Sequence, residues 1–152
     1  MQTPRKIYFL ILLAVFSTGL LAGCAGSSGE PRNSDIAMAS LEGMPAEVRD
    51  APPVVLESYQ FAAANPEILS QLPCFCGCGD MGHSSNYACY VKDVAADGKI
   101  TYDPHALGCS ICVDITQDAM RMLKEGKPLP EIRVFVDETY AQYGPSNMPP
   151  TE

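Results

Sequence analysis

Pro73-Cys74-Phe75-Cys76-Gly77-Cys78 opens a segment, residues 73–86, that is rich in glycine and cysteine and follows neither the helical nor the strand period. Such a segment is a loop, and its glycines leave it too flexible to keep one shape without a crosslink or a ligand. Alternate residues of an extended chain point to one side, and glycine lets the backbone wrap, so the three sulfurs can converge. Clustered thiolates form a soft, anionic clamp that suits Cu(I) or Zn(II), and not Mg²⁺ or Ca²⁺.

Further sulfur and imidazole groups flank this loop. Cys109 and Cys112 stand three residues apart at the start of a predicted helix, so their sulfurs share a face near the positive helix end, which favours thiolates. His83 lies inside the loop and His105 lies four residues before Cys109, and neither is on an apolar helical face. Both are candidate ligands beside thiolates, with exposed loop histidines as the alternative. The predicted metal ligands are Cys74, Cys76, Cys78, Cys89, Cys109, Cys112, His83 and His105.

Eight potential ligands exceed the four that one tetrahedral site needs. The sequence therefore allows one site with spare residues, two sites, or a Cu(I)-thiolate cluster. Cu(I) is our first choice of metal because clustered thiolates suit it, and Zn(II) follows closely.

Two other interpretations of the cysteines stay open. Outside the cytoplasm, six cysteines can form three structural disulfides in a passive surface module. Alternatively, Cys109 and Cys112 can act as the redox pair of a thiol-disulfide exchange protein. Calcium is disfavoured, because in the loop-like stretch from Asp93 the third ligand position is Ala95 and the bidentate glutamate is replaced by Pro104.

The chain around the loop has helical periodicity. Residues 54–65 and 67–72 predict a helix and a short helical turn, separated by Pro66. Residues from Cys109 on predict a longer helix that ends at Gly126, with Ile111, Ile115, Ala119 and Met122 on one face. Pro128 and Pro130 open a last helix with an apolar stripe, Ile132, Phe135, Val136, Thr139, Tyr140 and Tyr143. Asp97-Gly98 predicts a hairpin turn. We therefore expect a mainly α fold, a small helical bundle with a Cys/Gly-rich loop and a short β-hairpin.

The N-terminus is typical of an export signal. Arg5 and Lys6 precede an apolar run, residues 7–16, that is too short to span a bilayer. Leu21-Ala22-Gly23-Cys24 then resembles the bacterial lipobox, in which the cysteine is acylated and becomes the new N-terminus. This predicts an extracytoplasmic protein that acyl chains on Cys24 anchor to a bacterial membrane.

The predicted organisation has four parts: a signal peptide at 1–23, a flexible tether carrying lipidated Cys24 at 24–49, a Cys-rich helical metal-binding domain at 50–146 and a tail at 147–152. Ten Lys and Arg against 18 Asp and Glu give a net charge of −8, which disfavours nucleic-acid partners. Two histidines are too few for a His-rich catalytic metal centre. We expect a binding protein and not an enzyme, with a membrane and a metal ion as its partners.

Residues 73–78 resemble the signature of the bacterial PCYCGC-motif lipoprotein family, with Phe75 where the motif has tyrosine. The resemblance extends over residues 54–144 and includes the cysteines, both histidines and the Asp97-Gly98 turn. It implies a lipoprotein with a shared cysteine framework, and it implies no particular activity.

The C-terminal part also resembles the thiol-bearing subunit of bacterial cytochrome c maturation. The likeness lies in the Cys109/Cys112 pair, Glu125-Gly126-Lys127, Glu131-Ile132-Arg133 and Tyr143-Gly144. It implies a small helical bundle with a redox-active thiol. This chain departs from that subunit in its three clamp cysteines and in its predicted lipid anchor, where the subunit has a transmembrane segment.

Overall fold

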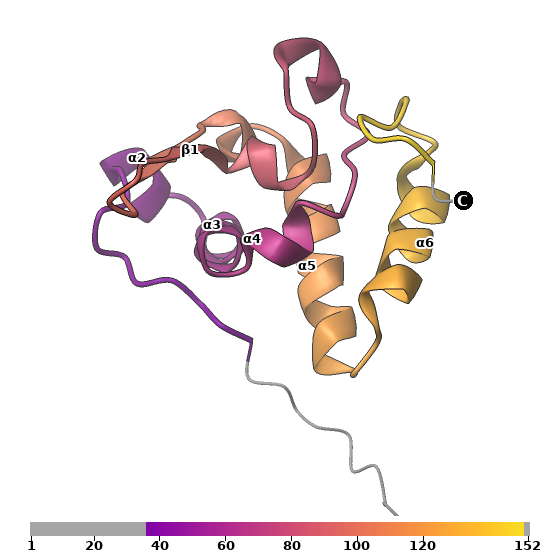
Figure 1. Ribbon diagram of the computed structural model, residues 1–152, viewed down its shortest axis with the longest axis horizontal. Helices are drawn as coiled ribbons and strands as arrows, with labels where there is room; N and C mark the ends of the chain where they lie inside the picture. The colour runs from indigo at the N-terminus through magenta and orange to yellow at the C-terminus, as the bar shows by residue number, and fades with distance from the viewer. Residues whose placement is uncertain (1–35, 151–152) are drawn as a thin grey trace, which may run out of the picture. The chain divides into compact units, whose positions relative to one another are not determined.

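The computed structural model describes residues 36–150. Its helices are α2 (Ala46–Arg49), α3 (Pro53–Ala64), α4 (Pro66–Leu69), α5 (Ser110–Lys124) and α6 (Leu129–Tyr140). Between α4 and α5 lie the 3-10 turns η1 (Cys78–Met81), η2 (Tyr87–Cys89) and η3 (His105–Leu107) and the strands β1 (Val91–Val94) and β2 (Ile100–Tyr102) (Figure 1). The predicted fold class, mainly α with a short hairpin, is confirmed.

The predicted signal peptide, Cys24 and the tether up to residue 35 lie outside the described residues. From residue 36 to residue 150, no helix is both long and apolar enough to cross a membrane.

Three helices form the frame that carries the loop. α5 and α6 pack as an antiparallel pair, and α3, seen end-on in Figure 1, crosses α5 at a steep angle. The predicted face of α5 is buried at Ile115, Ala119 and Met122, while Ile111 is partly buried. This packing holds the first turn of α5, which bears Cys112, in a fixed position.

The end of α5 follows its sequence closely. Gly126 has a φ of +78°, its N–H donates to the Leu123 carbonyl, and the N–H of Lys127 donates to the Met122 carbonyl. These two bonds are the Schellman arrangement, in which glycine adopts the left-handed conformation without a Cβ clash. The chain then reverses into α6 at Pro128.

α6 buries Ile132, Val136 and Tyr140, as its stripe predicts. The stripe ends earlier than expected, because the helix stops at Tyr140 and the side chain of Tyr143 is 56% exposed. Arg133 was not predicted to be buried, yet only 7% of it is exposed. Its guanidinium donates to Asp137 and to the carbonyls of Gln71 and Pro149. These bonds join α6 to the segment after α4 and to the C-terminal segment.

Residues before residue 50 also pack into the core of the domain. Met44 and Val48 are buried in the core. The Ala39 N–H donates to the Gln60 carbonyl, and the Gln60 amide donates back to Ala39. Two apolar residues without a repeat carry no periodic signal, so only the packing against α3 shows that the segment from residue 36 is part of the domain.

The strands β1 and β2 pair antiparallel, with Val94 opposite Ile100 and a bulge after Val91. The predicted turn is present, and Gly98 has a φ of +84°. This hairpin connects Cys89 to His105 and returns the chain to the start of α5.

Candidate metal centre

The loop, two 3-10 turns and the start of α5 bring all eight predicted ligands into one place, which we call the donor cluster: Cys74, Cys76, Cys78, His83, Cys89, His105, Cys109 and Cys112. Its six cysteines are free thiols. Groups of these donors have ligand atoms that all lie within 4.8 Å of one another.

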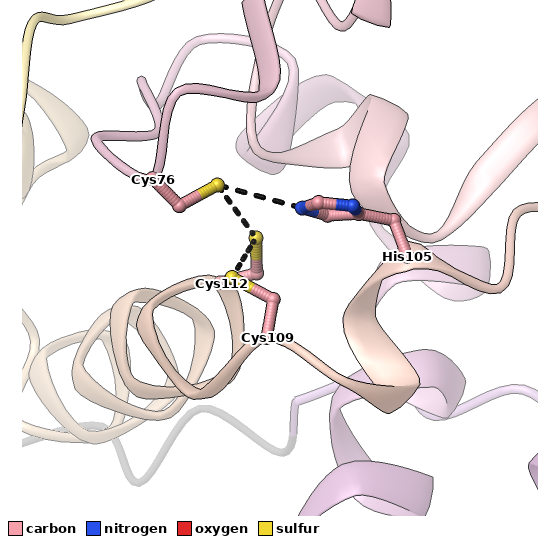
Figure 2. A group of neighbouring side chains, drawn as sticks. All are labelled: Cys76, His105, Cys109 and Cys112. Atoms are coloured by element: carbon pink, nitrogen blue, oxygen red, sulfur yellow. Dashed lines mark hydrogen bonds between the residues drawn. The ribbon is translucent and has the colours of Figure 1, made fainter.

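One four-donor group joins the loop to α5, and we call it the Cys₃His group: Cys76, His105, Cys109 and Cys112 (Figure 2). The Cys76 Sγ lies 3.4 Å from His105 Nε2 and 3.7 Å from the Cys112 Sγ. The Cys112 Sγ lies 3.3 Å from the Cys109 Sγ. A tetrahedral ion with Zn–S bonds of about 2.3 Å would separate its sulfurs by about 3.8 Å. The donors are thus spaced nearly as a tetrahedral ion requires.

A second four-donor group lies toward the hairpin, and we call it the Cys₂His₂ group: Cys78, His83, Cys89 and His105. The sulfurs of Cys78 and Cys89 are 3.7 Å apart and both residues are buried. The rings of His83 and His105 meet edge to face, with centroids 5.0 Å apart. His105 belongs to both groups.

Cys74 lies between the two groups. Its Sγ is 3.4 Å from the Cys76 Sγ and 3.3 Å from the Cys112 Sγ, both in the Cys₃His group. It also forms close three-sulfur sets with Cys76 and Cys78 and with Cys89 and Cys112. Cys74 is fully buried, so its sulfur has protein donors and no solvent around it.

Glycines shape the loop that carries these sulfurs. Gly77 and Gly82 flank η1 with φ values of +80° and +89°. Other residues rarely adopt this region, because their Cβ clashes with the backbone. The two left-handed positions bend the chain sharply on both sides of Cys78, which turns its sulfur back toward Cys89.

His83 has the arrangement of a metal ligand held by a carboxylate. Its Nε2 lies 3.5 Å from Asp103 Oδ2. Asp103 is itself held in place, because its Oδ1 accepts the His105 N–H and its backbone carbonyl accepts the Tyr59 hydroxyl. A proton on Nε2 leaves a lone pair on Nδ1, and His83 Nδ1 is the one buried side-chain nitrogen or oxygen of residues 36–150 without a hydrogen-bond partner. Carboxylate–histidine pairs of this kind orient metal-binding imidazoles.

Buried polar groups fix the start of α5. The Cys112 carbonyl accepts hydrogen bonds from Asn86 Nδ2 at 3.2 Å and from the Tyr90 hydroxyl at 2.8 Å. The Thr116 hydroxyl lies 2.8 Å from both Asn86 Oδ1 and the Tyr90 hydroxyl. This network joins the end of the loop and η2 to α5, so it fixes the position of Cys89 relative to Cys112.

Asn147 is a site residue that the sequence analysis missed, since it was assigned to the tail. Its Oδ1 accepts the Cys74 N–H at 2.7 Å, and its backbone N–H donates to the Cys74 carbonyl at 3.1 Å. Its Nδ2 donates to the His83 carbonyl at 2.9 Å. Asn147 therefore joins two points of the loop nine residues apart. A lone asparagine beyond the last helix carries no sequence signal for this role.

The thiols differ in how readily they ionise. Hydrogen bonding with Cys112 lowers the pKa of Cys74, and the hydrogen bond that Cys112 donates lowers the pKa of Cys109 to about 5. The same hydrogen bond to Cys109 raises the pKa of Cys112, and burial raises the pKa of Cys76 and of Cys78. The thiols of Cys74 and Cys109 thus lose their protons more readily than those of Cys76, Cys78 and Cys112. A cation beside the other thiols would favour loss of their protons, so a metal that bound here would release protons.

A cavity of about 570 Å³ opens beside the cluster and is lined by Met81, His83, Lys92, Asp103 and His105 among others. Both histidines reach it, and none of the six cysteines lines it. Met81 is 58% exposed at its rim. The cluster therefore meets this cavity through imidazoles.

These features define a mainly helical domain built around a cluster of thiol and imidazole donors. The chain matches, over residues 20–151, the model of a family described as protein of unknown function with PCYCGC motif, and it belongs to that family. No curated protein and no solved structure is similar enough to match the chain.

Proposed function

We propose that this protein binds a soft transition metal, Cu(I) or Zn(II), through the donor cluster while a lipid on Cys24 anchors it to the extracytoplasmic face of a bacterial membrane. The observation that carries the proposal is the convergence of six sulfurs and two imidazoles from separate segments of the chain. Neighbouring donors lie 3.3 to 3.7 Å apart, close to the edges of a tetrahedral metal site. Such a protein serves in metal trafficking or metal sequestration, or uses the metal to stabilise its own structure.

The donor types support a soft ion. Thiolates and imidazoles suit Cu(I) and Zn(II), whereas Mg²⁺ and Ca²⁺ take oxygen ligands. The two four-donor groups with histidine fit tetrahedral Zn(II). The all-sulfur sets around Cys74 fit Cu(I), which accepts soft thiolates alone.

Binding would also complete the fold of the loop. The ion would link Cys76 in the loop to Cys109 and Cys112 on α5, and so crosslink a glycine-rich segment to the helical frame. Metal binding and ordering of residues 73–86 are then one process. The protein acts by binding, and no catalytic step is part of the proposal.

The test uses the full chain, purified anaerobically in detergent from the membranes of an exporting host. We expect near-stoichiometric copper or zinc by mass spectrometry, with the thiols titrating only after a chelator is added. Replacing Cys74, Cys76 and Cys78 together by serine removes most of this metal. The matched control is Cys24→Ser, purified from whole cells in the same detergent, which leaves the donor cluster intact: it keeps the metal and lacks the acyl anchor. Unchanged metal in the triple variant contradicts the proposal, and so does a wild-type protein whose thiols appear only after reduction.

A second candidate function is thiol-disulfide exchange by Cys109 and Cys112. Their sulfurs are 3.3 Å apart, and the pKa of Cys109 is lowered to about 5 by its hydrogen bond from Cys112. An exchange protein requires a reducible pair, so its reduction potential should lie well above the range below about −300 mV that is typical of structural disulfides. A potential below that limit excludes this function.

A further inference from the structure

We infer that the donor cluster holds two metal ions, one in the Cys₃His group and one in the Cys₂His₂ end of the cluster, with Cys74 between them. The inference rests on the proposed function and deepens it, because it assigns each donor to an ion.

The first argument is the number and placement of the donors. The two four-donor groups share only His105. A tetrahedral ion takes four ligands, so one ion in the Cys₃His group leaves Cys78, His83 and Cys89 without a metal. Cys78 and Cys89 are buried and their sulfurs are 3.7 Å apart. The ligand atoms of these three residues lie within 4.8 Å of one another, so they supply three of the four donors of a second metal site.

The second argument is the unpaired nitrogen of His83. Nδ1 is buried and has no hydrogen-bond partner within residues 36–150, while Asp103 faces the other nitrogen. A buried polar atom without a partner is destabilising. His83 is not part of the Cys₃His group, so an ion there cannot satisfy it. An ion beside Cys78 and Cys89 can.

The third argument is the position of Cys74. His105 Nε2 lies 3.4 Å from the Cys76 Sγ, which assigns this nitrogen to the Cys₃His ion. The second ion then has Cys78, His83 and Cys89 and needs a fourth donor. Cys74 is within 4.8 Å of Cys78 in one three-sulfur set and of Cys89 in another. Its sulfur is also 3.3 Å from the Cys112 Sγ, so it is placed to bridge the two ions.

The negative charge of the thiolates also favours two metal ions. If all six thiols ionise as ligands, they bring six negative charges into a largely buried region, and one divalent ion then leaves a net charge of −4. A second divalent ion halves that remainder. Buried charge is costly unless it is paired, so the fully ionised cluster favours two cations over one.

The experiment titrates Zn(II) into the anaerobically reduced, metal-free full chain in detergent and counts bound ions by native mass spectrometry. Wild-type protein is expected to bind two. Cys109→Ser weakens the Cys₃His group, and His83→Ala and Cys89→Ser weaken the other. Each is expected to bind one ion, a twofold loss of stoichiometry. Cys24→Ser lies outside the cluster and is expected to bind two. Far-UV circular dichroism checks that each variant keeps its helices.

The outcomes separate the two claims. A wild-type protein that binds no Zn(II) and no Cu(I) overturns the proposed function itself. A wild-type protein that saturates with one Zn(II) overturns the two-ion inference and leaves metal binding standing, and this result needs no variant. A wild-type count of two that His83→Ala and Cys89→Ser both leave unchanged also overturns the inference, because the second ion would then lie elsewhere.

Discussion

At the scale of single residues, the cluster depends on side chains that bind no metal themselves. Asn147 is hydrogen-bonded to both the N–H and the carbonyl of Cys74 and to the carbonyl of His83. Asp103 faces His83 and accepts the His105 N–H. These two residues position ligands of the cluster through hydrogen bonds and a carboxylate contact, without binding a metal themselves.

Asn147→Ala should weaken metal binding while the fold persists. The change removes three side-chain hydrogen bonds, with the Cys74 N–H, the Cys78 Sγ and the His83 carbonyl. A hydrogen bond is worth about 0.5–1.5 kcal/mol, and the loss frees the loop at Cys74 and His83. We expect Zn(II) affinity to fall about tenfold, measured by competition with a chromophoric chelator. The control is Gln142→Ala, whose amide makes an exposed bond to the Thr139 carbonyl. Equal affinities for the two variants would show that Asn147 does not position the loop.

The pH dependence of Cys109 gives a second residue-scale prediction. Its pKa is about 5 because Cys112 hydrogen-bonds its thiolate, whereas an ordinary cysteine has a pKa of about 8.5. While Cys112 donates this hydrogen bond, Cys109 is therefore mostly a thiolate at pH values above about 5. In metal-free, reduced protein, iodoacetamide should label Cys109 as completely at pH 6 as at pH 8, as read by peptide mass spectrometry. Cys112→Ala removes the donor, and labelling at pH 6 should then drop; a profile that does not move contradicts this account.

At the scale of elements, the loop is bent by left-handed glycines and the helices supply rigid attachment points. Gly77 and Gly82 enclose η1, and the start of α5 presents Cys109 from its N-cap position and Cys112 from its first turn. The hairpin of β1 and β2 has the same kind of glycine at Gly98 but no ligand within it. Substitutions at Gly77 and at Gly98 should therefore cost similar backbone strain, and only the substitution at Gly77 should also affect metal binding.

Gly77→Ala and Gly98→Ala form a matched pair. Both glycines have φ near +80°, and a Cβ at either would meet no atom within 4 Å. Each substitution should destabilise the protein by about 1–2 kcal/mol through the left-handed backbone alone. Only Gly77→Ala should also lower Zn(II) affinity, because it moves Cys76 and Cys78. Thermal unfolding and chelator competition measure the two effects, and a loss of affinity in Gly98→Ala would be the unexpected result.

At the scale of the whole molecule, the donor cluster lies where the loop after α4 meets the start of α5. α3, α5 and α6 pack into a continuous core, whereas the loop after α4 contacts that core mainly through Cys74, Phe75 and Cys78. A metal would add bonds between the loop and α5. The stability of the loop should then follow the metal.

Zn(II) should raise the thermal midpoint of the reduced full chain. A ligand at 100 times its dissociation constant adds about 2.7 kcal/mol of stability when it binds only the folded state. Differential scanning fluorimetry should show a rise with Zn(II) and its reversal by a chelator. The variant with Cys74, Cys76 and Cys78 replaced by serine should show little of this rise. Identical midpoints with and without metal in wild-type protein would mean that binding and folding are not coupled.

Much of the fold was predictable because it is local. Helical periodicity placed α3, α5 and α6, Gly126 marked the end of α5, and Asp97-Gly98 marked the hairpin. The members of the donor cluster were predictable as well, since its cysteines and histidines lie in or beside one glycine-rich loop and at the start of one helix. The sequence did not predict that residues 36–49 belong to the domain, because Met44 and Val48 pack through contacts with distant residues.

The amino-acid sequence by itself determined which residues carry the chemistry, since side-chain type and close spacing are properties of the chain. Only the tertiary structure decided how these donors are grouped. Segments far apart in the chain meet because α3, α5 and α6 pack around one core. That packing puts His105 between two groups, and it leaves His83 Nδ1 without a hydrogen-bond partner among residues 36–150. It also brings Asn147 against Cys74, a contact over 73 residues that depends on burial and not on any local pattern.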